Sequence, residues 1–347
     1  MILCVYKVVV GYFNSDSGMT YSENIKFIKT NFPQLDLLTE TEFHLFKNES
    51  FALECIDSCI KLCNTASQNL EISVNFAVEY NYTFNAKAIV KDNNGIILLN
   101  LGLIERLEII VSDSIEVFYL ENISKLTFSQ IDKLEIKNLF SNLCISYLFH
   151  HELAHILQFL SFSSENHYNL NEENSNKNQF EIKNHIYEMD ADLFGITMCT
   201  SELLDYAKNI TYPFNTILVF NLLTTLLFSI SNIIIEFSKN QLADIYYKKQ
   251  SHPHPLIRII KCNDQILSFT SKNLAIQKEF FLAVLQRTFK IINQIQYNAK
   301  GRIDFSKLLH NNISEIELYI NEIEMESEKY NELIRFRVQK IFNSLHK

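Results

Sequence analysis

The chain has 347 residues, of which 47% are hydrophobic and 20% are charged, and its formal net charge is −9. This is the composition of a folded globular protein, which excludes wholesale disorder, and the length allows a large core and more than one domain. General nucleic-acid binding is excluded as well, because phosphate contacts need concentrated lysine and arginine and the sequence has no such block. The expected partner is therefore a protein or a small molecule.

Seven cysteines are scattered along the chain. This odd number is unlike the disulfide framework of a secreted protein, so we expect a cytoplasmic location, where thiols stay reduced. Cys55, Cys59 and Cys63 would share one helix face, but a metal site there would need a fourth ligand that the neighbouring sequence does not offer. We interpret these three as small apolar packing residues.

The N-terminal third mixes strand and helix patterns. Residues 1–13, MILCVYKVVVGYF, lack a cationic start and a small-residue cleavage site, which predicts a first strand rather than a signal peptide. A helix is expected over SENIKFIKTNF after a Ser22 cap. Between residues 70 and 120, strands are predicted in EISVNFAVEYNYTF, AKAIV, IILLNLGLI and LEIIVS, and KDNNG predicts a hairpin turn between the second and the third.

The rest of the chain reads as helices. One long helix is predicted from about residue 128 to 160, because apolar residues recur there at helical spacing. Residues 161–179 lose this periodicity and are rich in Asn, Ser and Glu, which predicts a surface loop. Helical patterning resumes near residue 180, is interrupted by the two prolines of QSHPHPLIRII, and fills the last 80 residues.

Residues 209–235 form an uncharged segment within this helical part. They are long enough to cross a bilayer, which takes about 20 apolar residues. However, Asn, Thr and Ser side chains dilute the hydrophobicity of the segment, and no basic cluster or aromatic belt flanks it tightly. A buried central helix is the preferred interpretation, and a membrane span is the alternative.

The stretch SYLFHHELAHILQFL, residues 146–160, places ionisable groups in an apolar helix. Residues four apart are neighbours on a helix, so His151 and His155 present their imidazoles to one point, with Glu152 beside them. Two neutral imidazoles at this spacing form half of a zinc site, and the carboxylate can act on a water. If the histidines only packed, Glu152 would remain a costly buried charge, so a metal site is preferred.

A catalytic zinc site needs a third protein ligand, and the next predicted helix offers one in HIYEMDADLFG. We expect Glu188 to bind the metal and Asp192, one turn later, to accept the Nδ1 proton of a ligating histidine. His185 is the reserve ligand. Asp190 points about 160° away from Asp192 and is expected to be solvated, while His150 is expected to lie at the rim or in the core.

The motif HELAH, followed by Glu188-x-x-Ala191-Asp192, resembles the gluzincin metallopeptidases, in which two histidines and a glutamate hold zinc. FNAKA, GIILLNLGLIERL and SHPHPLIRI are similar to segments of the branch that contains the CAAX prenyl endopeptidases, the HtpX heat-shock proteases and their soluble relatives. The zinc motif also resembles that of the Lit type of phage-exclusion peptidase. The resemblance covers about residues 80–260. It implies an α+β, mainly α fold with a small sheet packed on the active-site helix and extra C-terminal helices.

This reading divides the chain into an N-terminal α/β region (1–65), a zincin-like catalytic domain (66–262) and a C-terminal helical region (263–347). The branch often carries several strongly apolar spans, and this chain has one weak candidate, so a soluble cytoplasmic variant is expected. The expected activity is a zinc-dependent endopeptidase that acts on a protein or peptide substrate. A catalytically silent zinc-binding interaction module and a single-pass membrane metallopeptidase are the alternatives.

In this scheme Zn²⁺ is bound by the two motif histidines and Glu188, and Glu152 is the general base. His252 and Arg258 are expected to stabilise the oxyanion, with His254 as the alternative to His252. The other interpretation of this segment is a helix stop at its prolines, with Arg258 in a structural salt bridge. The strand IILLNLGL is expected to accept an extended substrate by edge pairing, and Gly102 either allows a close backbone approach or ends this strand.

Overall fold

The structure is a computed structural model. It describes residues 18–70, 72–120, 133–162, 181–210, 216–238, 245, 250, 252–273, 278–298 and 304–344. The strand expected at residues 1–13 lies outside this range, and so do residues 163–179 of the expected loop.

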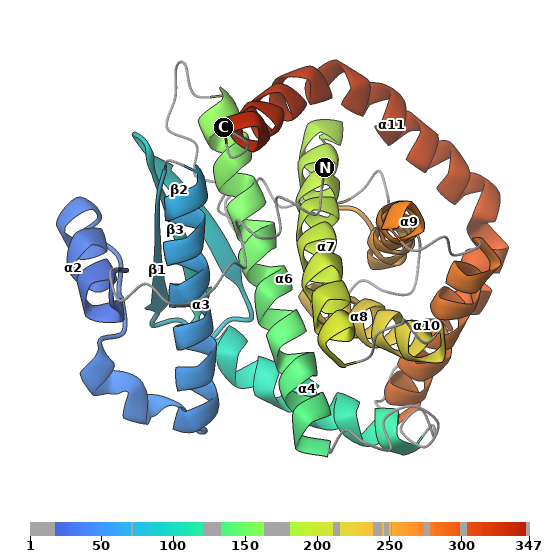
Figure 1. Cartoon of the computed structure of the whole chain (residues 1–347), viewed down its shortest axis with the longest axis horizontal. Coiled ribbons are helices and arrows are strands. Elements are labelled where there is room, and N and C mark those ends of the chain that lie inside the picture. The colour runs from blue at the N-terminus through green and yellow to red at the C-terminus, as the bar shows by residue number, and fades with distance from the viewer. Residues whose placement is uncertain are drawn as a thin grey trace. The chain divides into compact units, whose positions relative to one another are not determined.

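The described chain is mainly helical with one three-stranded mixed sheet, which confirms the predicted α+β, mainly α class (Figure 1). The elements in chain order are α2 (Tyr21–Asn31), the 3-10 helix η1 (Glu40–Leu45), α3 (Glu49–Leu70), β1 (Ser73–Glu79), β2 (Ala86–Lys91), β3 (Asn94–Asn100), α4 (Leu101–Leu120), α6 (Lys133–Phe162), α7 (Ile182–Ile210), α8 (Thr216–Phe237), α9 (Pro255–Asn273), α10 (Lys278–Asn298) and α11 (Phe305–Ser344).

The chain divides into two compact units. The first contains α2, η1, α3, the sheet, the start of α4 up to Arg106, α6 from Leu148 and α11 from Glu326. The second contains the rest of α4, α6 up to Tyr147, helices α7 to α10, and α11 up to Met325. Helices α4, α6 and α11 therefore run through both units. The division of the chain at residues 65 and 262 stays a prediction.

The sheet of the first unit has the strand order β1-β3-β2. β1 runs parallel to β3, and β2 pairs with β3 in antiparallel register from Ala86↔Leu99 to Lys91↔Asn94. The two-residue connection that follows Lys91 contains Asp92, whose φ of 56° is left-handed, a conformation that aspartate tolerates better than most residues. The predicted hairpin is confirmed.

The edge pairing that we expected for IILLNLGL is wrong, because β3 is the central strand and both of its sides are hydrogen-bonded. The outer edge of β1 is covered by side chains. The backbone N–H groups of Val74, Phe76 and Val78 donate to Ser67 Oγ (2.9 Å), Asn24 Oδ1 (2.9 Å) and the Tyr21 hydroxyl (3.2 Å), respectively. β2 forms the other edge of the sheet.

Helices cover this sheet. The inner residues of β1 and β3 are buried whichever way they point, so both faces of these strands are covered. α2 and α3 contact β1, and a Cβ atom at Gly95 of β3 would lie 2.6 Å from a side-chain carbon of Ile156 in α6. The sheet therefore packs against the part of α6 that carries the metal motif, as the resemblance implied.

Two local predictions are corrected. LEIIVS, predicted as a strand, lies inside α4, because Leu103, Leu107, Ile110 and Val111 follow helical spacing and are buried. α2 is capped by Thr20 rather than by Ser22: the Thr20 hydroxyl accepts from the Glu23 N–H at 3.3 Å, and Glu23 Oε2 accepts from the Thr20 N–H at 2.8 Å. This reciprocal pair is a capping box.

The uncharged segment forms α8, a core helix of the second unit that contacts α7, α9 and α10. Its polar side chains are satisfied locally, since the hydroxyls of Thr225, Ser229 and Ser231 donate to carbonyls four residues earlier. By length and composition alone α8 could also cross a membrane, a test that buried core helices pass too. The preferred interpretation of this segment as a buried helix agrees with its packing.

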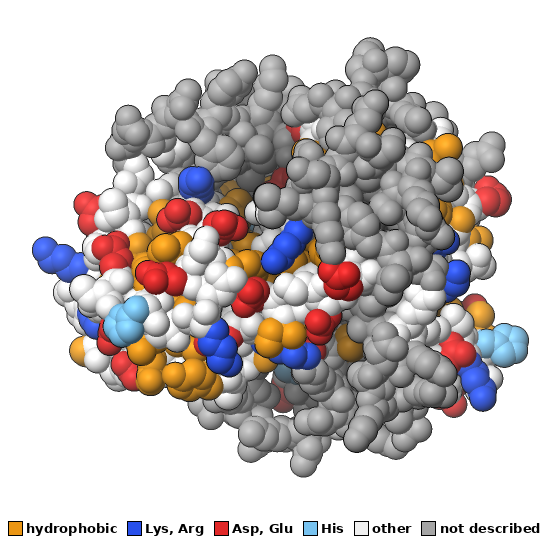
Figure 2. Space-filling view, turned by 90° about the horizontal axis from the view of Figure 1, so that it is seen from below, with side chains coloured by type: hydrophobic (Ala, Val, Ile, Leu, Met, Phe, Trp, Pro, Cys, Tyr) orange, Lys and Arg blue, Asp and Glu red, His pale blue; other side chains and the backbone are white. Residues whose placement is uncertain are grey.

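The surface drawn in Figure 2 mixes charges of both signs. Lys and Arg side chains lie among Asp and Glu side chains, and the coloured part of this face shows no continuous basic patch. An exposed basic stripe, which phosphate binding requires, is thus not visible on the described part of this face.

Candidate metal centre

The motif residues lie in the second half of α6, on a stretch that is buried on all sides. His151, Glu152 and His155 are 6%, 4% and 4% exposed, and the apolar residues between and around them, such as Leu153 and Ile156, are buried as well. Long apolar runs without helix breakers fold as helices that are enclosed by their neighbours. The helix therefore holds three ionisable side chains away from bulk water.

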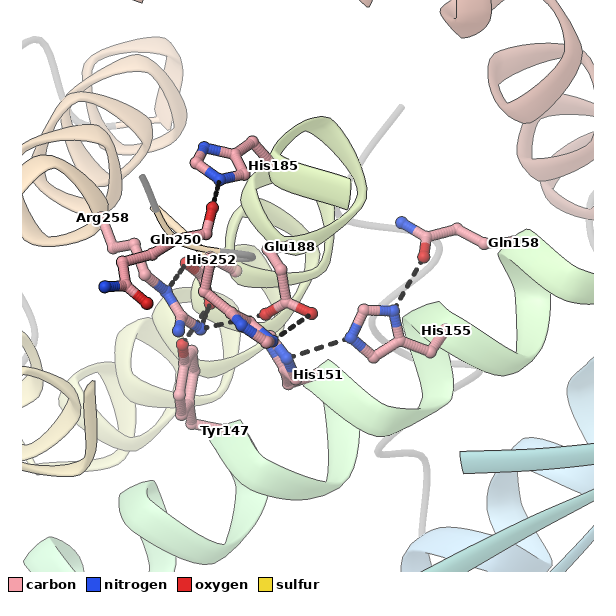
Figure 3. Close-up of polar contacts among 10 residues, drawn as sticks. Tyr147, His151, His155, Gln158, His185, Glu188, Gln250, His252 and Arg258 are labelled. Atoms are coloured by element: carbon pink, nitrogen blue, oxygen red, sulfur yellow. Dashed lines mark hydrogen bonds and ion pairs between the residues drawn. The ribbon is translucent and has the colours of Figure 1, made fainter. Parts of the chain in front are cut away.

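Three potential ligands converge at this point (Figure 3). The Nε2 atoms of His151 and His155 are 3.1 Å apart, and Glu188 of α7 completes a group whose ligand atoms all lie within 4.8 Å of one another. Glu188 is 6% exposed. Among the described residues, this is the cluster of histidine, cysteine and acidic side chains that could hold a metal ion.

The geometry of the two imidazoles suits a tetrahedral zinc ion. With Zn–N distances of about 2.0–2.1 Å, a tetrahedral ion separates its ligands by about 3.3 Å, close to the observed 3.1 Å. When no cation is bound, a contact of this length is a hydrogen bond in which one of the two Nε2 atoms carries a proton, and a shared cation would take the place of that proton. Two imidazoles and one carboxylate are also the donor set of many catalytic zinc sites.

Gln158, rather than Asp192, holds the far side of the His155 ring. The Nδ1 atom of His155 lies 2.8 Å from Gln158 Oε1, and Gln158 is only 2% exposed. Our expectation that Asp192 would accept an Nδ1 proton is thus corrected for His155. Sequence reasoning missed Gln158, although its i+3 spacing from His155 places both on the same helix face.

Asp192 instead binds Arg258 and Tyr147. The Nε and Nη2 groups of Arg258 donate to its two carboxylate oxygens at 2.7 Å each, and the Tyr147 hydroxyl donates to Oδ1 at 2.5 Å. All three residues are buried. Burial alone would lower the pKa of the Arg258 guanidinium, but the Asp192 carboxylate outweighs it and raises this pKa well above its usual value. Burial raises the pKa of the Tyr147 hydroxyl, which stays protonated as a donor.

Two cationic or potentially cationic groups flank Glu188. Arg258 Nη2 lies 3.6 Å from Oε2, and His252 Nε2 lies 3.6 Å from Oε1. Asp192 therefore acts on Glu188 through Arg258. We had predicted instead that it accepts a proton from a ligating histidine. The ion pair with Asp192 matches the structural salt bridge of our alternative interpretation, and the oxyanion roles of His252 and Arg258 stay predictions.

His254 has a structural role at the start of α9. It is fully buried, and its Nδ1 accepts from the Leu256 N–H at 3.1 Å while Pro255 occupies the first helical position. The side chain of His252 is 32% exposed and lies beside Glu188. His252 thus lies at the site, beside Glu188.

His185 is not part of the metal group. Its Nδ1 bonds the Tyr319 hydroxyl of α11, and its Nε2 lies 2.8 Å from the backbone oxygen of Gln250. A carbonyl oxygen only accepts, so Nε2 carries the proton and Nδ1 accepts from the tyrosine. Burial lowers the pKa of His185 to about 4, which keeps the ring neutral.

His150, Asp190 and the three cysteines of α3 are the remaining candidates. His150 is buried against the ring of Phe149, as the core interpretation expected. Asp190 is partly buried rather than fully solvated. The three cysteines of α3 are each 1% exposed, and burial raises the pKa of the Cys59 and Cys63 thiols well above its usual value, as expected for packing residues.

Comparisons of the chain with protein-family models, with curated proteins and with solved structures gave no match. What stands is a buried His151, His155 and Glu188 group that could hold a metal ion, in a mainly helical chain with a small mixed sheet. This arrangement is compatible with the two-histidine, one-glutamate zinc site that the motif resembles.

Proposed function

We propose that this chain is a zinc-dependent endopeptidase of the gluzincin type that hydrolyses peptide bonds of an intracellular protein substrate. The observation that carries the proposal is the convergence of the His151, His155 and Glu188 ligand atoms within 4.8 Å of one another. Glu152 supplies the second element of the motif, because it follows His151 on the same buried turn of α6.

Each residue then has a role. A bound zinc ion supplies Lewis-acid chemistry that polarises a peptide carbonyl and makes a water more acidic. Glu152 takes a proton from the attacking water and returns it to the leaving amine. His252, which is partly exposed beside Glu188, donates to the developing negative charge of the carbonyl oxygen. Arg258, buried and held by Asp192, fixes the position of Glu188.

The substrate that this proposal favours is an extended segment of a protein. β2 is an edge strand, whereas the outer edge of β1 is occupied by side chains. A strand added at β2 would fix the backbone of the substrate through main-chain hydrogen bonds. The acidic net charge and the mixed surface of Figure 2 support a protein partner over nucleic acid, and the odd cysteine number supports the cytoplasm.

The test combines metal analysis with degradation of casein. The purified chain should contain about one zinc per chain, as one three-ligand site requires. Glu152→Gln should keep zinc and abolish cleavage, because it removes the base but no ligand. Glu188→Ala should lose zinc. Cleavage retained by Glu152→Gln, or unchanged zinc content in Glu188→Ala, would show that the roles are assigned wrongly.

A second candidate is a catalytically silent zinc-binding interaction module. The burial of all three ligands favours it, since a catalytic ion needs a position open to water. In that case zinc would stabilise the fold, and neither the wild type nor Glu152→Gln would cleave casein. A single-pass membrane metallopeptidase is less favoured because α8 is largely buried within its unit, and fractionation of cells would decide the point.

A further inference from the structure

We propose that Gln158 is a positioning residue of the metal centre, whose amide oxygen holds the Nδ1–H of His155 and so directs its Nε2 to the metal. This inference rests on the metal site of the proposed function. It assigns a role to a residue outside the HELAH motif and outside the later segments that resemble known metallopeptidases.

The contact is built into α6 itself. Gln158 follows His155 by three residues, so the two side chains lie on one face of the helix. Gln158 Oε1 lies 2.8 Å from Nδ1, while the opposite ring nitrogen, Nε2, lies 3.1 Å from Nε2 of His151 (Figure 3). Both side chains are nearly inaccessible, at 2% and 4% exposed, so water does not compete for this hydrogen bond.

The chemistry of the two groups fixes the tautomer. A neutral imidazole carries a single N–H, and an amide oxygen can only accept a hydrogen bond. The proton of His155 therefore lies on Nδ1, and the lone pair on Nε2 is left to bind a cation. In water the Nε2–H and Nδ1–H tautomers exchange freely, so a buried acceptor on one side removes the need to select a tautomer when the metal binds.

The amide performs this task without adding charge. Glu152 and Glu188 already place two acidic side chains in the buried site, and a third carboxylate would carry a large desolvation cost in the metal-free protein. Glutamine has the length and the acceptor of glutamate without this cost. A carboxylate at position 158 should still accept the hydrogen bond from Nδ1–H of His155. Because it makes His155 a stronger ligand, the Gln158→Glu site should bind the metal at least as tightly as the wild type.

The direct test uses the zinc-free wild-type chain with ¹⁵N-labelled histidine. Long-range ¹H–¹⁵N spectra distinguish the two tautomers, and the signals of His155 are identified by their loss in His155→Gln. The Nδ1–H tautomer is the expected result. An Nε2–H tautomer, or a mixture of the two, overturns the inference. This measurement needs neither zinc nor activity, so its outcome is separate from that of the proposed function.

Zinc affinity, measured by competition with a chromophoric chelator, gives the second test. Gln158→Met keeps the side-chain length without the acceptor and should bind zinc about 10–100-fold more weakly, whereas Gln158→Glu should match or exceed the wild type. Gln265→Met is the control, because the Gln265 amide also makes a partly buried hydrogen bond, from Nε2 to Thr197 Oγ1 at 2.7 Å, and its loss should leave the affinity unchanged. Wild-type affinity in Gln158→Met, or a loss in Gln158→Glu as large as in Gln158→Met, contradicts the inference. A wild-type chain that binds no zinc removes the proposed function itself.

Discussion

Replacement of Arg258 by methionine should be among the most destabilising changes in the second unit. Arg258 is 5% exposed and Asp192 is 1% exposed, and two hydrogen bonds of 2.7 Å join them. The same guanidinium lies 3.6 Å from Glu188. Methionine fills most of the volume but leaves two acidic side chains in the interior without their cation.

The expected magnitude follows from burial rather than from distance. Removing one partner of a buried ion pair costs about 3–5 kcal/mol, because the remaining charge stays desolvated. Lys261 provides a matched control on the same helix: its Nζ lies 2.7 Å from Glu324, whose side chain is 56% exposed. A solvent-exposed pair of this kind contributes about 0–1 kcal/mol, so Lys261→Met should be nearly silent.

Urea denaturation of the two variants and the wild type, in the presence of a chelator, measures the difference. Arg258→Met should lower the midpoint strongly, and Lys261→Met should shift it little, with similar slopes. Equal losses of unfolding free energy in the two variants would refute the reasoning, since the two pairs share their N–O distance and differ in burial.

First, the pKa of His185 is lowered from 6.5 to about 4, so the unfolded chain binds the proton first as pH falls. The contribution of this residue to the unfolding free energy is fully present above pH 6.5 and should decline by about 3 kcal/mol down to pH 4. Denaturation of the metal-free wild type and of His185→Gln across this range should therefore show a loss about 3 kcal/mol larger in the wild type. Second, Gly102→Ala should destabilise by about 3 kcal/mol or more, because its Cβ would lie 2.1 Å from the Tyr82 carbonyl oxygen, whereas Gly195→Ala meets a Tyr147 side-chain carbon at 3.1 Å and should cost less; thermal melts compare the two. Third, zinc at a hundred times its Kd should add about 2.7 kcal/mol to wild-type stability and nothing to Glu188→Ala, as calorimetry with and without zinc would show.

The parts of this molecule that sequence predicted well depend on local spacing. His151 and His155 are one helical turn apart. Glu188 is the first acidic residue of the next helix, and Asp192 follows it by four residues. The β2–β3 hairpin was visible because its turn residues are neighbours in the chain. Burial of α8 was foreseen from polar side chains that weaken it as a membrane span.

The parts that sequence did not predict depend on contacts between distant residues. Asp192 pairs with a guanidinium 66 residues further along the chain, so its partner could not be chosen from helical geometry. The LEIIVS segment of α4 predicts a strand because a short apolar run fits both the strand and the helix period, and only its burial pattern separates the two. Strand order also depends on contacts between distant residues. We expected β3 to be an edge strand, but it is the central strand of the sheet.

The side chains that cover β1 have a consequence for self-association. Outward-facing N–H groups on a sheet edge are a template on which another copy of the chain can pair and begin an ordered aggregate. Here Tyr21, Asn24 and Ser67 occupy three of them, and the Tyr21 hydroxyl also donates to the Leu38 carbonyl at 2.9 Å. A second molecule that approaches this edge would meet N–H groups that are already hydrogen-bonded. This protects a concentrated solution of the protein from fibril growth along β1.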